Sequence, residues 1–273
     1  MADRVVVITG ASSGIGAALA RQLGKRGERV VLGARRGELL RKVAAESGPD
    51  ALAVVTDVTK RAEVERLRDE AIKKFGRVDV WVNNAGSSIT RNTEAITDED
   101  ARMIFDVVVM SVLYGVQSIL PHFKARGEGH IVNVSSFLGR VPLIPYRSIY
   151  SACKSAVNVL SANLRMDLGA SYPRIRVSVV MPGIVDTPYH EVAGPGLKVR
   201  AGGYLGTTRV ESADEVASKI VEVIDRPVAE AYTSPSSIGL VESYFKDVGA
   251  FEENLAKRRQ GTEGDNQGRS QYR

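Results

Sequence analysis

Seven short runs of apolar and β-branched residues are spaced along the chain, and each run predicts a β-strand. Because consecutive positions in each run are apolar, both faces of each strand should be covered, as in a parallel sheet. The predicted strands are Arg4–Ile8, Arg29–Gly33, Leu52–Val55, Val78–Val82, His130–Val134, Arg176–Val180 and Glu230–Thr233.

The stretches between these strands have helical periodicity, as where Ile15, Leu19 and Leu23 share one helical face. This alternation predicts an α/β fold: one doubly wound, Rossmann-type parallel sheet of about seven strands with helices on both faces. No linker interrupts it, so we predict a single domain over residues 1–256, followed by an unstructured polar tail over 257–273. Ligands of such sheets bind at the carboxyl ends of the strands.

Two stretches depart from the alternation. Residues 186–210 are rich in glycine and include two prolines, which predicts a lid over a substrate; the next helix should begin at Ser212, with Glu215 completing a capping box. The helix around Asp98–Leu120 is apolar nearly all round, which predicts burial in the core or against another subunit. We therefore expect a homodimer or homotetramer.

Composition narrows the class of protein. The single cysteine, Cys153, excludes an internal disulfide, and its small neighbours favour a structural helix residue over a nucleophile. We find no secretion signal and no apolar run of about 20 residues, so we expect a cytoplasmic protein without a membrane span. The net charge is +5, but the basic residues are scattered along the chain and aromatic residues make up only 6%, which does not favour a nucleic-acid partner. No metal is expected, because the three histidines lack ligand spacing: His122, His130 and His190.

A glycine-rich segment, Thr9–Gly16, follows the first strand and opens a helix. Glycines let the backbone approach a pyrophosphate, and the helix N-terminus presents free N–H groups to it. A tight turn without a ligand is the alternative. The residues expected to bind a dinucleotide here are Gly10, Ser12, Ser13, Gly14, Ile15 and Gly16.

The second predicted strand is followed by Ala34, Arg35 and Arg36. Sites selective for NAD place an acidic residue near this point to bind the ribose 2′-hydroxyl, whereas a 2′-phosphate favours arginine. The planar donors of Arg35 therefore favour NADP(H) over NAD(H), with Arg36 as a second phosphate contact. The alternative is that both arginines are solvated residues at a helix start.

Several further motifs follow strands or open helices in a fixed order, and with them the chain resembles the short-chain dehydrogenase/reductase family over residues 4–235. Besides the glycine-rich loop, the motifs are Asp57-Val58, Asn83-Asn84-Ala85-Gly86, Ser135-Ser136, Tyr150-Ser151-Ala152-Cys153-Lys154 and Pro182-Gly183-Ile184-Val185-Asp186-Thr187. The resemblance implies an NADP(H)-dependent oxidoreductase that moves hydride between the cofactor and a small-molecule carbonyl or secondary alcohol. It also implies cofactor contacts at Asp57, Val58, Asn84, Ala85, Gly86, Tyr150, Lys154, Pro182, Gly183, Val185 and Thr187.

The catalytic residues implied by this resemblance are Ser136, Tyr150 and Lys154. Tyr150 and Lys154 are four residues apart and so share one helical face. A nearby ammonium favours the phenolate, so Tyr150 can exchange a proton with the substrate oxygen as general acid and base. Ser136 would donate a hydrogen bond to that oxygen. Ser135 is the alternative, and we prefer Ser136 because Phe137-Leu138-Gly139 follows it.

One position departs from the family pattern. An asparagine whose backbone carbonyl holds a proton-relaying water is usual, but counting back from Pro121 gives Val108. Valine lacks the amide side chain that would support the local helix distortion, so we expect an altered relay.

Two other functions stay open at this stage: an NADP(H)-binding regulatory or scaffold protein with little turnover, and an epimerase or dehydratase on the same fold. An epimerase would normally have a larger C-terminal region than the forty or so residues found here. The segment from Leu138 to Pro145 is apolar and could wall the substrate site. This favours a medium-sized apolar ketone or alcohol without identifying it.

Overall fold

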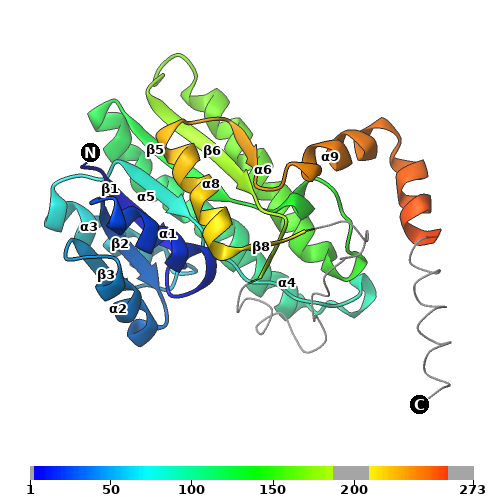
Figure 1. The fold of residues 1–273 in the computed structure, drawn as a ribbon, viewed down its shortest axis with the longest axis horizontal. Helices are drawn as coiled ribbons and strands as arrows, with labels where there is room; N and C mark the ends of the chain where they lie inside the picture. Colours follow the sequence, from blue (N-terminus) through cyan, green and yellow to red (C-terminus); the bar gives the residue numbers. More distant parts are fainter. Residues whose placement is uncertain (1–2, 187–208, 258–273) are drawn as a thin grey trace.

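The computed structural model describes residues 3–186 and 209–257. A seven-stranded parallel sheet forms its centre, in the order β3-β2-β1-β4-β5-β6-β9 (Figure 1). The strands are β1 (Val5–Thr9), β2 (Arg29–Ala34), β3 (Ala51–Val55), β4 (Val80–Asn83), β5 (Gly129–Val134), β6 (Ile175–Met181) and β9 (Glu230–Tyr232). All seven predicted strands are confirmed, with bounds that differ by one or two residues, and so is the fold class.

Helices cover both faces of the sheet because side chains of a buried strand point alternately to its two sides. Val6 and Ile8 pack with α1, α2 and α8, whereas Val5 and Val7 pack on the opposite face with α3, α5 and α6. The helices are α1 (Gly14–Lys25), α2 (Gly37–Glu46), α3 (Arg61–Phe75), α4 (Asp98–Phe105), α5 (Ser111–Arg126), α6 (Ser148–Leu168), α8 (Ala213–Asp225) and α9 (Ser236–Lys246).

The long apolar helix predicted around Asp98–Leu120 contains a π-helical turn at Asp106–Met110, between α4 and α5. The backbone N–H of Ser111 donates to the carbonyl of Asp106, five residues earlier, and its hydroxyl donates to the carbonyl of Val107 at 2.6 Å. Val108 is buried at the centre of the turn, so the distortion forms without the amide side chain that we expected it to need.

This stretch corrects a second expectation. By length and composition alone, Asp98–Arg126 could cross a membrane, so the view that no apolar stretch is long enough does not hold. Its position explains its composition: Ile119 and Phe123 pack on the sheet, and Ile104 and Val112 pack beside α6. It is a core helix of the layer on that face.

The ends of the predicted lid are held together. β7 (Ile184–Asp186) pairs in parallel with β8 (Val210–Ser212), two short strands that the hydrophobic pattern did not indicate. The predicted capping box of Ser212 and Glu215 is present at the start of α8. The remainder of the lid, with Thr187 and His190, and the tail beyond Lys257 lie outside the described residues.

Two C-terminal helices were not predicted from the sequence: α9 and a second helix over residues 248–257. Leu240, Val241 and Phe251 from this region pack with Val141 and Leu143, which follow β5. Val141 and Leu143 are therefore buried against the C-terminal helices rather than free to line a substrate site. Our domain bounds of 1–256 and 257–273 stay predictions; Lys257 itself is helical.

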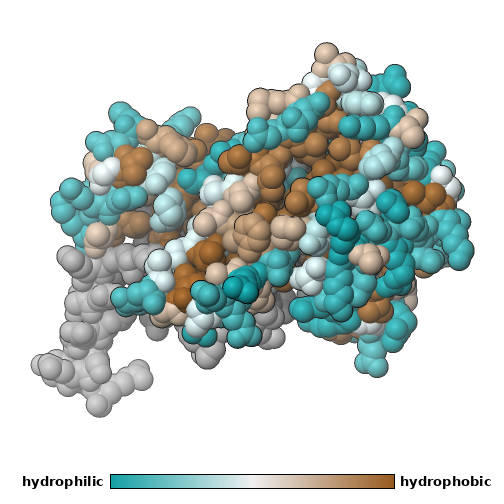
Figure 2. All heavy atoms as spheres, turned by 180° about the vertical axis from the view of Figure 1, so that it is seen from behind, coloured by the Kyte–Doolittle hydropathy of each residue, from teal (hydrophilic) through white to brown (hydrophobic). Residues whose placement is uncertain are grey.

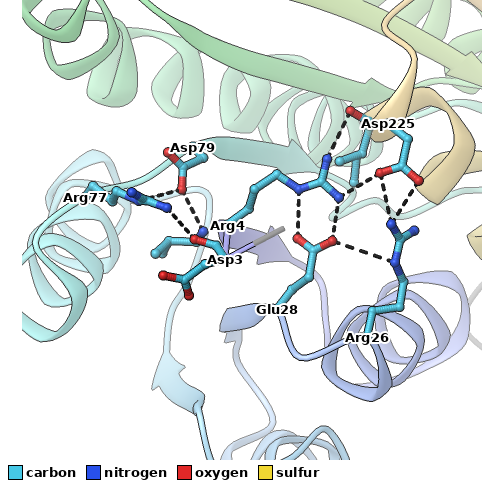
Figure 3. A network of polar contacts seen from close by, with 9 residues as sticks. Asp3, Arg4, Arg26, Glu28, Arg77, Asp79 and Asp225 are labelled. Carbon is cyan, nitrogen blue, oxygen red and sulfur yellow. Dashed lines mark hydrogen bonds and ion pairs between the residues drawn. The ribbon is translucent and has the colours of Figure 1, made fainter. Parts of the chain in front are cut away.

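A network of ion pairs lies at the amino ends of the strands (Figure 3). Arg4, next to the first residue of β1, donates from Nε to the carboxylate of Glu28 at 2.9 Å and from Nη2 to Asp225 at 2.7 Å. The Glu28 side chain is 1% exposed, so its charge depends on this partner. The Nε atom of Arg26 is farther from the same carboxylate, at 3.8 Å.

We predict that Arg4→Met lowers the free energy of unfolding by about 2 kcal/mol or more, because removing one partner of a buried pair leaves an uncompensated charge. Denaturant titration at neutral pH measures the change. Arg21→Met is the matched control: it breaks the exposed pair with Glu46 and should cost less than about 1 kcal/mol. Equal losses in the two variants would contradict the role given to Glu28.

Candidate active site

The glycine-rich loop lies against the segment that follows β4, so tightly that side chains are excluded. Gly10 has a φ of +68°, and a Cβ added there would lie 2.7 Å from the Cα of Ala85. A Cβ on Gly16 would lie 2.6 Å from the Nδ2 atom of Asn84. Only glycine fits these two positions, so the loop backbone is bare where it passes Asn84 and Ala85.

Thr9 ties the ends of β1 and β4 together, a role that the sequence analysis did not predict. Its Oγ1 atom accepts hydrogen bonds from the backbone N–H groups of Asn84 at 3.0 Å and Ala85 at 3.1 Å. The Nδ2 atom of Asn84 donates in return to the carbonyl of Thr9 at 2.9 Å. The two predicted cofactor motifs are thus one hydrogen-bonded unit.

The loop residues leave the start of α1 available to an anion. The side chain of Ser13, the N-cap residue, makes no capping bond to the first turn. Instead, Arg36 donates to the hydroxyl groups of Ser12, from Nη2 at 3.0 Å, and of Ser13. Gly14 starts the helix and Ile15 packs on the core beneath it. Uncapped N–H groups and bare glycine backbone fit the pyrophosphate of a dinucleotide.

The ends of β2 and β3 place a cation beside an anion. Burial disfavours the charge of Asp57, but hydrogen bonds from the backbone and side chain of Thr59 and the charges of Arg35 and Lys60 outweigh it and lower the carboxyl pKa. Arg35 is exposed and lines a hollow of about 640 Å³ together with Thr59, residues of α4 and the start of the π-helical turn. Val58 is buried in the core below.

The two serines after β5 have different partners. The hydroxyl of Ser135 donates to the carbonyl of Lys154 at 3.1 Å, which fixes it to α6. The hydroxyl oxygen of Ser136 accepts from the N–H of Leu138 at 3.2 Å. The hydroxyl proton of Ser136 is not used in that bond, whereas that of Ser135 is.

Lys154 lies inside the protein at the end of β5. Its Nζ atom donates to the carbonyl of Val134 at 2.8 Å and lies 5.8 Å from the centre of the Tyr150 ring. Burial lowers the pKa of Lys154 to about 8. A Cβ on Gly86 would lie 4.0 Å from the same Nζ atom, so the segment after β4 and the Tyr150–Lys154 pair meet at one place.

The segment after β6 is also anchored at this edge. Pro182 accepts a hydrogen bond at its carbonyl from the N–H of Phe137 at 2.8 Å, beside Ser136. The N–H of Gly183 donates at 3.2 Å to Glu211, a buried carboxylate on β8 that also accepts from the hydroxyl of Thr233 at 2.7 Å. Val185 lies on β7. Glu211 escaped the sequence analysis because a lone acid before a helix cap carries no distinguishing pattern.

A buried chain of polar side chains connects the sheet to α6. Asn83 donates from Nδ2 to Oδ1 of Asn133 at 2.9 Å, and Asn133 donates to the hydroxyl of Ser161 at 2.8 Å. Trp81 donates to Asn83 at 2.8 Å from below. Such satisfied networks fix neighbouring elements at a set position, here β4, β5 and α6.

Cys153 supports the structural reading of the lone thiol. It is buried among Ile104, Val108 and Val157, and burial raises its pKa to about 11, which disfavours a nucleophilic thiolate. Over residues 3–186 and 209–257, no three or more histidine, cysteine or acidic side chains gather in an arrangement that could hold a metal ion.

Comparisons with known proteins agree with this arrangement. The family model described as short chain dehydrogenase matches residues 4–196. An uncharacterized oxidoreductase of Bacillus subtilis, YxnA, is 35% identical over 84% of this chain, and the match spans 65% of that relative's length. An uncharacterized oxidoreductase of Listeria innocua is 34% identical over 82% of this chain and 92% of its own.

Solved structures share the fold. A short chain dehydrogenase/reductase from Burkholderia phymatum, in complex with NAD, has a TM-score of 0.81 at 27% identity, covering 92% of this chain and 96% of that one. The 3-ketoacyl-(acyl-carrier-protein) reductase of Brucella melitensis, complexed with NADH, has a TM-score of 0.76 at 31% identity, with coverages of 84% and 96%. An alcohol dehydrogenase from Thermococcus sibiricus, complexed with 5-hydroxy-NADP, has a TM-score of 0.72 at 29% identity, with coverages of 84% and 95%. Since the family model spans most of the sheet and the site at its carboxyl edge, this chain belongs to the short-chain dehydrogenase family.

Proposed function

We propose that the protein is an oxidoreductase that moves hydride between NADP(H) and a carbonyl or secondary alcohol, with Tyr150 as general acid and base. The observation that carries this proposal is the buried ammonium of Lys154, which lies 5.8 Å from the centre of the Tyr150 ring beside the cofactor motifs. A regulatory protein without turnover is less well supported, since the similar proteins named above are oxidoreductases.

Tyr150 and Lys154 divide the proton chemistry. A free phenol titrates near pH 10, and a neighbouring positive charge stabilises its anion, which makes proton exchange possible nearer neutral pH. In reduction, the phenol of Tyr150 gives its proton to the substrate oxygen as that oxygen gains negative charge; in oxidation, the phenolate takes the proton back. The nicotinamide, when bound, supplies or accepts the hydride.

Ser136 is the residue that we assign to the substrate oxygen. Its hydroxyl oxygen already accepts from the N–H of Leu138, so its proton can be donated elsewhere. Ser135 is less suitable because its proton is used in the bond to the carbonyl of Lys154. A donor held in place before the reaction stabilises the charge that develops on the oxygen without a cost of reorganisation.

The preference for NADP(H) rests on the two arginines after β2. Ala34 offers no carboxylate to a ribose 2′-hydroxyl, and Arg35 is exposed at the end of the strand, where it can turn to a phosphate. Arg36 donates to the hydroxyl groups of Ser12 and Ser13 and so also stabilises the glycine-rich loop, which we expect to bind the pyrophosphate. These contacts give the two arginines different expected effects on cofactor binding.

We also propose that two or four copies of the chain associate. The face opposite to that seen in Figure 1 carries a band of apolar side chains (Figure 2). Met103 and Phe105 of α4 and Val159 and Met166 of α6 are among the exposed large apolar residues. Exposed apolar surface on α4 and α6 favours burial against a second copy.

Tyr150→Phe should reduce NADPH-dependent carbonyl reduction by about 100-fold or more, because the proton donor is lost. A panel of carbonyl compounds, from small ketones to 3-ketoacyl thioesters, identifies the substrate to be used. NADPH affinity, measured by its fluorescence, should stay within a few fold of the parent protein. Loss of cofactor affinity with retained turnover would contradict the acid role.

Arg35→Ala should weaken NADPH binding by about 10- to 100-fold, the value of a charge-assisted hydrogen bond, and change NADH binding little. Arg36→Ala is the matched control: it loosens the glycine-rich loop and should weaken the binding of both NADPH and NADH. Isothermal titration calorimetry with each cofactor measures the dissociation constants. An equal effect of Arg35→Ala on NADPH and NADH would exclude the phosphate assignment.

Val108→Asn tests whether the family's usual residue matters here. The π-helical turn already exists with valine, and the side chain of Val108 is buried beside Cys153. We therefore expect the pH–rate profile to stay unchanged while the amide in an apolar cluster costs about 1–3 kcal/mol of stability. Val108→Ala, which keeps the backbone carbonyl, should also leave the profile unchanged. If the pH–rate profile shifts in Val108→Asn but not in Val108→Ala, the valine does alter the proton relay.

A further inference from the structure

Glu211 is a buried carboxylate on β8 that contacts the segment after β6, residues 182–185. It is 5% exposed, although glutamate is rarely buried in proteins unless its side chain has partners. One carboxylate oxygen, Oε2, accepts hydrogen bonds from the N–H of Gly183 at 3.2 Å and from the hydroxyl of Thr233 at 2.7 Å. In the parallel pairing of β7 with β8, Glu211 is also the partner of Val185. Side chain and strand pairing therefore join Glu211 to the same short segment.

Gly183 lies so close to this carboxylate that a side chain would not fit without a shift. A Cβ added to Gly183 would lie 3.1 Å from Oε2 of Glu211. The N–H of Gly183 also donates to the hydroxyl oxygen of Thr233 at 3.3 Å, so the three groups form one closed set of hydrogen bonds. Thr233 is itself tied to the end of β6, because its N–H donates to the carbonyl of Met181 at 3.4 Å.

The peptide group that joins Pro182 to Gly183 is held at both of its polar ends. Its carbonyl accepts from the N–H of Phe137 at 2.8 Å, next to Ser136, and its N–H donates to Glu211. The carbonyl and N–H of a trans peptide point in opposite directions, so the two contacts lie on opposite sides of the chain. Together they fix the plane of this peptide, and Glu211 supplies the contact on the side away from Ser136.

The position of this segment in the sheet assigns it to one half of the cofactor site. In the observed strand order, Arg35 follows β2, the glycine-rich loop follows β1, Ser136 follows β5, and residues 182–185 follow β6. The proposed contacts for the phosphate and the pyrophosphate are thus at one end, and the proposed catalytic residues are at the other. Residues 182–185 lie at the catalytic end, where the nicotinamide must react.

We propose that Glu211 is a positioning residue for the nicotinamide half of the cofactor. This inference rests on the proposed use of NADP(H). Backbone groups of residues 182–185 can hold a ligand beside Ser136 only if their own position is fixed, and Glu211 fixes the peptide from which they start. The adenosine half, which we assign to the glycine-rich loop and Arg35, does not depend on this contact.

The test compares two ligands: NADPH, and 2′-phospho-ADP-ribose, which has the same phosphates but lacks the nicotinamide. Isothermal titration calorimetry measures both dissociation constants. We expect Glu211→Leu to weaken NADPH binding by about 10- to 100-fold and to change binding of the fragment by less than about threefold. Glu211→Gln keeps an oxygen acceptor and should restore most of the affinity for NADPH. The fluorescence of NADPH bound at saturation, which reports on the surroundings of its nicotinamide, should change in Glu211→Leu and return toward the parent value in Glu211→Gln.

Thr233→Val removes one donor to the same carboxylate oxygen with little change in size, and it decides the question if Glu211→Leu does not fold. We expect it to weaken NADPH binding by about threefold or more and to spare the fragment. Glu215→Leu is the matched control: it breaks the exposed capping box at the start of α8, does not touch Gly183, and should leave both ligands unaffected. Circular dichroism melting establishes that each variant is folded.

Equal losses for NADPH and the fragment would overturn the inference, and so would unchanged NADPH binding in both Glu211→Leu and Thr233→Val. Failure of the proposed function is a separate result, because these binding measurements need no turnover. In that case Tyr150→Phe would retain activity, while Glu211→Leu would still lose affinity for NADPH alone.

Discussion

The site depends on the hydrogen bond between the ammonium of Lys154 and the carbonyl of Val134. A buried ammonium needs an acceptor, and this one is the last residue of β5, so α6 must lie across the end of that strand. Gly139 also packs closely against α6: a Cβ added there would lie 2.8 Å from the carbonyl carbon of Lys154. Ser155 and Asn158 both donate to the carbonyl of Gly139. With α6 fixed in this way, Tyr150 stands one helical turn before Lys154.

The cofactor half of the site is joined to the catalytic half through the segment after β4. Thr9 holds Asn84 and Ala85 against the glycine-rich loop, and a Cβ added to Gly86, next in the chain, would lie 4.0 Å from the Nζ atom of Lys154. Neither half needs a mobile loop to meet the other. The carboxyl edge of a parallel sheet brings strand ends together. Here hydrogen bonds link β1 with β4, β4 with β5, and the segment after β5 with the segment after β6, which explains why ordered motifs in the sequence mark a single place.

The sheet and most motif positions could be predicted from the sequence because consecutive apolar residues and glycine spacing are local signals. The π-helical turn at Asp106–Met110 could not, since one additional residue in a helical turn leaves apolar periodicity almost unchanged. β7 and β8 have three residues each, too few to form a pattern. Glu211 could not be predicted either, because its burial depends on residues distant in the chain.

The two ends of the sheet treat buried charge differently, and this difference agrees with the chemistry proposed for the carboxyl end. At the amino end, the cation of Arg4 meets the carboxylate of Glu28, so each charge is compensated and the loss of either partner would leave the other uncompensated. At the carboxyl end, the ammonium of Lys154 donates to the carbonyl of Val134, which accepts a hydrogen bond but has no charge with which to compensate the ammonium. Burial then lowers its pKa, which costs stability in the protonated form. Such a cost is retained where the field of the charge serves an anion, and we propose that this anion is the phenolate of Tyr150, whose ring centre lies 5.8 Å from the ammonium.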